Sequence, residues 1–178
     1  MADLGLIQVY TGNGKGKTTA SLGLAMRACG HGLQVCMIQF MKENTEYGEF
    51  KSSANLPGFT LLQVGRNDFV DLENPAEIDK TLARNGWSLA KSIISSGKYD
   101  IVILDEVNVA MACKILDVNA VVTFLTKDRK NLIKIPEIIL TGRYAPPEII
   151  SIADLVTNMD EVRHHYSIGT ESRKGIEF

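Results

Sequence analysis

The stretch Thr11-Gly12-Asn13-Gly14-Lys15-Gly16-Lys17-Thr18-Thr19 decides how this chain folds. It follows an apolar segment, 4–10, that is typical of a strand, and it opens a segment of helical period. Glycines let the backbone turn tightly with its N–H groups directed at anionic oxygens. The Lys17 ammonium adds a point charge, and the Thr18 hydroxyl can ligate a Mg²⁺ that bridges phosphates. The stretch predicts a phosphate-binding loop, although Thr11 replaces the usual leading glycine; the alternative is a glycine-rich surface turn.

Short apolar runs alternate with helical patterns along the rest of the chain. Strands are expected at 4–10, 33–40, 60–64, 99–105, 137–141 and 154–159, and helices at 17–29, 75–96, 118–127 and 146–152. Several of the strands are continuous apolar runs, as in a parallel sheet that is covered on both faces. The predicted fold class is α/β, with a mostly parallel sheet and helices on both faces. We expect a single domain over 1–178 and a polar, lid-like loop over 41–57.

Charged side chains follow two of the predicted strands. Asp105 and Glu106 end the apolar run 101–104, and Arg143 follows the run 138–140 through Thr141-Gly142. Because ligands bind at the carboxyl ends of parallel strands, these side chains are expected to meet the phosphate loop at one edge. Asp105 can support Mg²⁺, Glu106 can contact nucleotide or polarise water, and Arg143 can bind phosphate through two parallel hydrogen bonds. The alternatives are two solvated acids at a turn and a surface salt bridge.

The composition excludes several classes of function. The chain has 19 basic and 21 acidic residues and a net charge of −2, so no overall field favours nucleic acid or an anionic membrane. No apolar stretch reaches the roughly 18 residues of a membrane span, and no signal peptide opens the chain. The three cysteines show no C-x-x-C spacing, as expected of reduced thiols. We therefore expect a cytoplasmic protein.

Some candidate residues have weaker support. Arg27 lies ten positions after Lys17, about 15 Å along a helix, so a solvated arginine is the simpler interpretation. His164 and His165 are adjacent and lack a third Cys or His nearby, which argues against a zinc site. Phe69 stands in a polar context, where an aromatic side chain invites a functional explanation.

Several motifs together resemble the P-loop family of ATP:corrinoid adenosyltransferases. They are the loop 12–19, the strand motif 38–42, Leu104-Asp105-Glu106, Thr141-Gly142-Arg143, and the terminal segments 153–157 and 175–178. The resemblance covers nearly the whole chain. It implies a RecA-like α/β fold that transfers the 5′-deoxyadenosyl group of ATP to Co(I) of a corrinoid, either cobalamin or cobyrinic acid a,c-diamide, and releases triphosphate.

The resemblance also assigns roles to residues. It implies that Arg27, Glu106 and Arg143 contact the nucleotide, and that ATP lies reversed in the loop, with its ribose C5′ exposed to the corrin. Phe69 matches an aromatic residue that the family is held to use to displace the lower cobalt ligand. Asp71 stands where relatives have a second aromatic residue. Some members also carry an N-terminal extension that helps to cover the corrin, whereas three residues precede Leu4 in this sequence. Mg²⁺ is the implied cofactor, with a homodimer and an electron-donor flavoprotein as partners.

Two other classes of function remain open from the sequence. A RecA-like ATPase would use Glu106 to activate water and would release ADP and phosphate. A nucleotide-responsive binding module would turn over negligibly. The identity of the released product separates these possibilities from adenosyl transfer.

Overall fold

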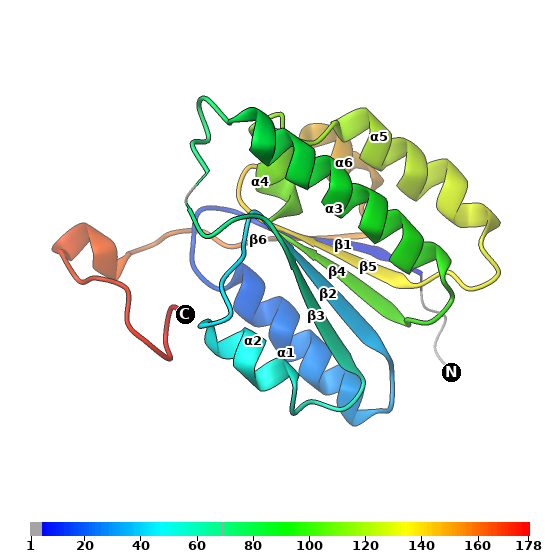
Figure 1. Cartoon of the computed structure of the whole chain (residues 1–178), viewed down its shortest axis with the longest axis horizontal. Coiled ribbons are helices and arrows are strands. Elements are labelled where there is room, and N and C mark those ends of the chain that lie inside the picture. The colour runs from blue at the N-terminus through cyan, green and yellow to red at the C-terminus, as the bar shows by residue number, and fades with distance from the viewer. Residues whose placement is uncertain (1–4, 69) are drawn as a thin grey trace.

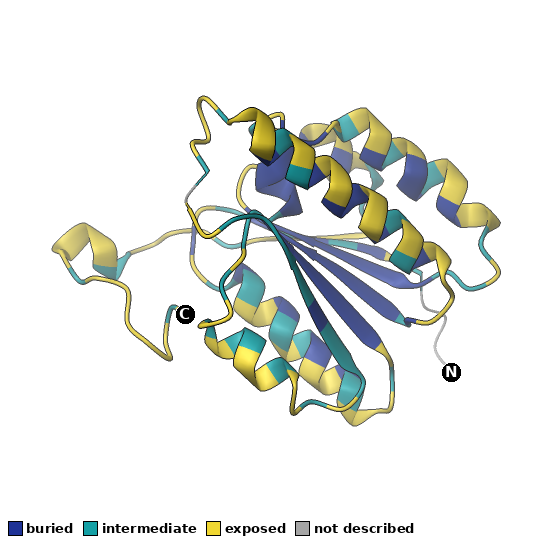
Figure 2. Cartoon of the chain, viewed as in Figure 1, coloured by how far each residue is buried: buried dark blue, intermediate teal, exposed yellow. Residues whose placement is uncertain are grey.

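The computed structural model describes residues 5–68 and 70–178, and its centre is a six-stranded sheet in which every pairing is parallel. The strands are β1 (Ile7–Thr11), β2 (Val35–Phe40), β3 (Phe59–Val64), β4 (Ile101–Asp105), β5 (Glu137–Thr141) and β6 (Leu155–Asn158). Every residue of β2, β4 and β5 is buried, because these central strands are covered on both faces (Figure 2). The six predicted strands are confirmed, and so is the α/β class with a parallel sheet between two helical layers.

The strand order brings the predicted motifs together. It runs β3-β2-β4-β5-β1-β6, so β5 lies between the strand that precedes the phosphate loop and the strand that ends at Asp105. Tyr10 pairs with Thr141, and Leu104 pairs with Leu140. Because these strands are parallel and in this register, the segments that follow β1, β4 and β5 leave the sheet at the same edge.

Two helical layers cover the sheet (Figure 1). On one side lie α1 (Lys17–Gly30) and α2 (Gly48–Ser53), and on the other lie α3 (Glu77–Ser95), α4 (Val107–Ala112), α5 (Val118–Thr123) and α6 (Pro147–Ile152). Each layer encloses its own apolar core: α1 packs on Met37 and Ile103, whereas Trp87 of α3 meets Phe124 edge-on with ring centroids 5.5 Å apart.

Two helices lie where none was predicted. α2 replaces part of the expected loop 41–57, and α4 follows directly after Glu106. Five of the six residues of α4, VNVAMA, are buried. Because the helix is covered on nearly all sides, its sequence is mostly apolar and lacks the amphipathic period that marks a surface helix. The predicted helix 118–127 begins as α5 and continues as a π-helical turn over Phe124–Asp128.

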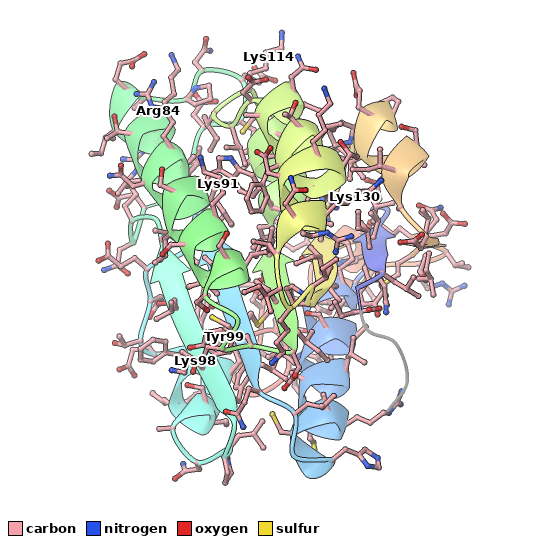
Figure 3. The ribbon with its side chains drawn as sticks, turned by 90° about the vertical axis from the view of Figure 1, so that its right-hand side faces the viewer. Arg84, Lys91, Lys98, Tyr99, Lys114 and Lys130 are labelled. Atoms are coloured by element: carbon pink, nitrogen blue, oxygen red, sulfur yellow. The ribbon has the colours of Figure 1, made fainter. Side chains whose placement is uncertain are left out.

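The chain beyond β6 leaves the body of the sheet and returns toward α2 (Figure 1). It contains one short 3₁₀ helix, His165–Ile168, and its side chains are mostly exposed. On another face, α3 and the segments beside it present several cations, Arg84, Lys91, Lys98, Lys114 and Lys130 (Figure 3), and Lys98 lies 5.0 Å from the centre of the Tyr99 ring. Within the described ranges, no helix has both the length and the apolar character needed to cross a membrane.

Candidate functional site

The phosphate loop connects β1 to α1 at the shared sheet edge. Gly16 adopts φ 119° immediately before α1, a conformation that favours glycine. A Cβ atom at Gly12 would lie 2.4 Å from Met159 O, and one at Gly14 would lie 2.6 Å from Asp160 O. The chain that follows β6 therefore packs closely against the loop. These glycines are required for that packing, whether or not a ligand is bound.

Lys17 and Thr11 fix the interior of the loop. The Lys17 side chain is buried at the start of α1, and its ammonium donates to Gly14 O at 2.5 Å. Burial lowers the pKa of Lys17, the Arg143 charge lowers it further, and Glu106 opposes both. The Thr11 hydroxyl, at the position of the usual first glycine, accepts from Ala145 N at 3.2 Å and so ties the loop to the segment after β5.

Asp105 ends β4 with a fully buried carboxylate whose oxygens are saturated by donors. Oδ1 accepts from the hydroxyls of Thr18 at 2.9 Å and Thr141 at 2.6 Å. Oδ2 accepts from Gln39 Nε2 at 3.1 Å and Lys42 Nζ at 3.0 Å. A carboxylate has about four lone-pair positions, and all four are in use. Burial alone would raise the pKa of Asp105, but Lys42 and the hydroxyl donors outweigh burial and lower the pKa.

Glu106 turns its carboxylate toward the loop. Its backbone is left-handed, at φ 60°, and its N–H donates to Thr141 Oγ1 at 3.1 Å. Unlike Asp105, Glu106 is partly exposed. Burial and the charge of Asp105 raise the pKa of Glu106, against the opposing charges of Lys42, Lys17 and Arg143. Glu106 is thus the carboxylate of the pair that remains available to a ligand.

Lys42 enters the site from the end of β2. The preceding Met41 has φ 58°, a left-handed conformation that costs a non-glycine residue about 1–2 kcal/mol. Met41 N donates to Val64 O at 2.9 Å, and a Cβ atom at Gly65 would lie only 2.3 Å from Lys42 N. Burial would lower the pKa of Lys42, but Asp105 and Glu106 outweigh it and raise the pKa.

Three of the cavities at this edge of the sheet share Glu106. One of about 290 Å³ is lined by the phosphate loop, Glu106 and Arg143, and is the expected place for phosphates. A second, of about 840 Å³, lies between α1, α2 and the C-terminal residues. A third, of about 430 Å³, is lined by the loop that contains Arg66, Asp68 and Val70. Glu106 lines all three cavities, so a ligand in any of them reaches this carboxylate.

The C-terminal residues form one wall of the site. Lys15 Nζ donates to Ile176 O at 2.9 Å and to Glu177 Oε1 at 3.0 Å, and Arg173 pairs with the same carboxylate at 3.0 Å. The hydrogen bonds and charge of Arg173 and Lys15 outweigh burial and hold the pKa of Glu177 well below its usual range. The Phe178 ring lies 6.3 Å from that of Tyr47, centroid to centroid.

The structure brings together most of the predicted site residues. Gly14, Lys15, Gly16, Lys17, Thr18, Thr19, Glu106 and Arg143 line one cavity, and Asp105 lies behind Thr18. Arg27 is exposed near the end of α1 and lines none of the three cavities. Phe69 lies outside the described residues, although its neighbours Asp68 and Val70 line the third cavity. Asp71 forms an exposed turn, in which Oδ1 accepts from Glu73 N at 2.9 Å.

Sequence reasoning did not select three side chains of this site: Gln39, Lys42 and Tyr47. Gln39 is fully buried and joins Asp105 to Gln63, whose Nε2 donates to Gln39 Oε1 at 3.0 Å. A signal for Lys42 was present, because a cation that follows the run 35–41, apolar except for Gln39, meets the same criterion as Arg143 after 138–140. No comparable signal marks Tyr47, which depends on how the following loop folds.

The sequence is similar to known proteins over nearly its full length. Residues 3–178 match the family described as ATP:corrinoid adenosyltransferase BtuR/CobO/CobP. A corrinoid adenosyltransferase of a Sinorhizobium species is 34% identical over 178 residues, which cover 98% of this chain and 80% of that protein. A corrinoid adenosyltransferase of Escherichia coli K12 is 36% identical over 177 residues, which cover 98% and 86% of the two chains. The relative named corrinoid adenosyltransferase CobA from Salmonella typhimurium is 33% identical, with the same two coverages.

Among solved structures, the ATPase EscN of the type III secretion system of enteropathogenic E. coli, in complex with its central stalk EscO, matches with a TM-score of 0.49 and 18% identity. The match covers 88% of this chain and 43% of that chain.

Proposed function

Because this chain belongs to the ATP:corrinoid adenosyltransferase family, we propose that its three connected cavities hold ATP and a corrinoid so that the adenosyl group passes between them. The activity is transfer of the adenosyl group of ATP to a corrinoid. In finer terms, we propose that Co(I) attacks the ribose C5′ and that triphosphate leaves.

One observation supports this proposal most strongly. The phosphate-loop cavity shares Glu106 and Arg143 with the third cavity, which is lined by the loop around position 69. Hydrolysis of ATP needs room for one water molecule beside the phosphates. The third cavity, of about 430 Å³, opens onto the same carboxylate and suits a second substrate that is much larger than a water molecule.

The residues at the loop stabilise the leaving group. The nucleophile belongs to the substrate, so the protein requires no nucleophilic side chain and acts by placing fixed charges and donors where negative charge develops. Backbone N–H groups of the loop and the ammonium of Lys17 are proposed to bind the triphosphate. Arg143 reaches the same cavity from β5 with a planar, bidentate group. Arg27 and Phe69 keep the roles that the family implies, as predictions.

A Mg²⁺ ion fits the donors that remain free. The Thr18 hydroxyl directs its proton to Asp105, so its lone pairs face the cavity, and the Glu106 carboxylate lines the same space. Mg²⁺ is commonly held by one or two protein oxygens together with water and phosphate oxygens. We propose that Thr18 and Glu106 hold the ion and that Asp105 supports it through Thr18. When bound, the ion neutralises charge on the phosphates.

An anaerobic assay tests the function directly. The protein, ATP and Mg²⁺ are mixed with cobalamin that has been chemically reduced to Co(I), and loss of the Co(I) spectrum is followed together with the phosphate products. Adenosyl transfer yields triphosphate and a cobalt–carbon bond. ADP and orthophosphate without loss of Co(I) would identify the protein as an ATPase and refute the proposal.

The proposed partners follow from the family. We propose a homodimer, an electron-donor flavoprotein that supplies Co(I), a cytoplasmic location and one domain over 1–178. The edge strand β6 supports self-association, because Leu155 and Val156 are 43% and 42% exposed and the sheet order ends at this strand. Light scattering tests the dimer.

A further inference from the structure

Two of the three cavities meet at a junction formed by three side chains. Among residues 5–68 and 70–178, only Lys42, Tyr47 and Glu106 line both the cavity of about 840 Å³ beside α1 and the cavity of about 430 Å³ beside the loop around position 69. If ATP extends from the phosphate-loop cavity into the larger of these two cavities and the corrinoid occupies the other, the bond that forms and the bond that breaks lie near this junction. Of the three side chains, Lys42 alone is a cation.

The position of Lys42 is built into the fold. Its backbone follows a left-handed Met41 and is closely packed against Gly65. The next turn is also fixed, because Asn44 N donates to Gln63 Oε1 at 2.9 Å and Gln63 is hydrogen-bonded to Gln39. A strained and over-determined backbone of this kind persists where the surrounding structure holds a side chain in a required place.

The Lys42 ammonium is held but not enclosed. Nζ lies 3.0 Å from Asp105 Oδ2, and the Lys42 side chain keeps 22% of its surface exposed while that of Asp105 has none. An ammonium has three N–H donors, and one of them is used by the carboxylate. The remaining donors are available at the junction.

We propose that Lys42 is a further catalytic residue, which donates to the α-phosphate of ATP and neutralises the charge that develops there as the C5′–O bond breaks. This inference rests on the proposed function. The electron pair of Co(I) forms the cobalt–carbon bond, and the pair of the C5′–O bond leaves with the triphosphate, so no proton is transferred. Asp105 orients the ammonium, and Gln39 helps to hold that carboxylate in place.

The test compares Lys42→Met, Lys42→Ala and Lys42→Arg with the parent protein and with Lys51→Met. Lys51 is the matched control, since it lies on the following helix, pairs with Glu46 at the surface and lines none of the three cavities. Stopped-flow spectra follow the consumption of pre-reduced cob(I)alamin at saturating ATP and Mg²⁺, and thermal melts report folding.

For Lys42→Met we expect kcat to fall by about 10²-fold while KM for ATP changes by less than about threefold, the pattern for an interaction made in the transition state. Ethylammonium should restore part of the rate of Lys42→Ala and leave the parent unchanged. Lys42→Arg keeps the charge and should lose less than Lys42→Met, and Lys51→Met should match the parent.

A kcat for Lys42→Met within about threefold of the parent would overturn the proposal, because the loss of one electrostatic stabiliser is larger. A change confined to KM for cobalamin would overturn it too, since Lys42 would then bind the corrinoid. A loss that ethylammonium does not relieve, accompanied by a lower melting temperature and equal in Lys42→Arg, would assign Lys42 a structural role. If the parent itself consumes no cob(I)alamin, the proposed function fails, whatever Lys42 does.

Discussion

Replacing Gly65 with alanine places a methyl group where the structure has no room for one. The new Cβ would lie 2.3 Å from Lys42 N and 2.5 Å from the carbonyl carbon of Met41. An unstrained contact between carbon atoms is about 3.5–4.0 Å, so the backbone that carries Lys42 must move. Gly65 itself is not in the left-handed region, so the substitution tests packing without a conformational penalty of its own.

The expected cost follows from overpacking. Forcing an extra methyl group into a packed site costs about 1–3 kcal/mol, which for a chain of this size lowers Tm by about 2–12 °C. Gly23→Ala is the matched control, because Gly23 lies inside α1 and a Cβ there meets no atom within 4 Å. Removing an interior helix glycine gains about 0.5–1 kcal/mol, so Tm should rise by about 1–4 °C.

Calorimetry of the two variants measures these shifts, and the cob(I)alamin assay measures their activity. We expect Gly65→Ala to lose adenosyl transfer as well as stability, because the displaced backbone carries Lys42, whereas Gly23→Ala should keep the parent rate. A Tm for Gly65→Ala equal to that of the parent would refute the close approach of Gly65 to Lys42, and with it the argument that the fold fixes this lysine.

Three further substitutions test the rest of the site. Lys17→Ala should lower kcat/KM for adenosyl transfer by at least about 10–10²-fold through loss of one buried cation, and near-normal turnover would contradict the assignment of the loop. Glu106→Gln should raise Tm at pH 7. Because the pKa of Glu106 is raised in the folded protein, this residue lowers stability as the pH rises above about 4.3, its pKa in the unfolded chain. In a series of melts, the higher Tm of Glu106→Gln should therefore disappear below that pH. Arg143→Lys keeps the charge but not the bidentate geometry, so an unchanged rate at saturating ATP would leave Arg143 only a surface role.

The sequence was sufficient for the sheet and for the edge where the site lies. Apolar runs that end in charged residues, such as 101–104 before Asp105, identify buried parallel strands and the side of the sheet at which they finish. Strand order is non-local, so the placement of β5 between β1 and β4 required the structure. The same applies to α4, whose buried sequence carries no helical period, and to α2, which lies among polar residues.

The different roles of the paired acids also could not be predicted from their adjacent positions in the sequence. Asp105 and Glu106 look equivalent at the end of one strand, but Asp105 continues β4 inward, where Thr18, Thr141, Gln39 and Lys42 converge on it. Glu106 turns left-handed and stays partly exposed. Three of those four donors come from other strands or the segments after them, so only the folded sheet shows which carboxylate is free.

The charges around these acids suit the release of an intact triphosphate. An ATPase breaks the P–O bond between the γ-phosphorus and the oxygen that bridges it to the β-phosphate, and it leaves the ester oxygen at C5′ untouched, so its cations gather at the β- and γ-phosphates. Adenosyl transfer breaks the C5′–O bond, and the oxygen that becomes negative is the one attached to the α-phosphate. A site for that reaction requires a cation beside the nucleoside end of the phosphates, in addition to the lysine of the loop. Lys42 lies at the junction toward the second substrate and is separate from the Lys17 cavity, so it supplies charge at the place where hydrolysis would not need it.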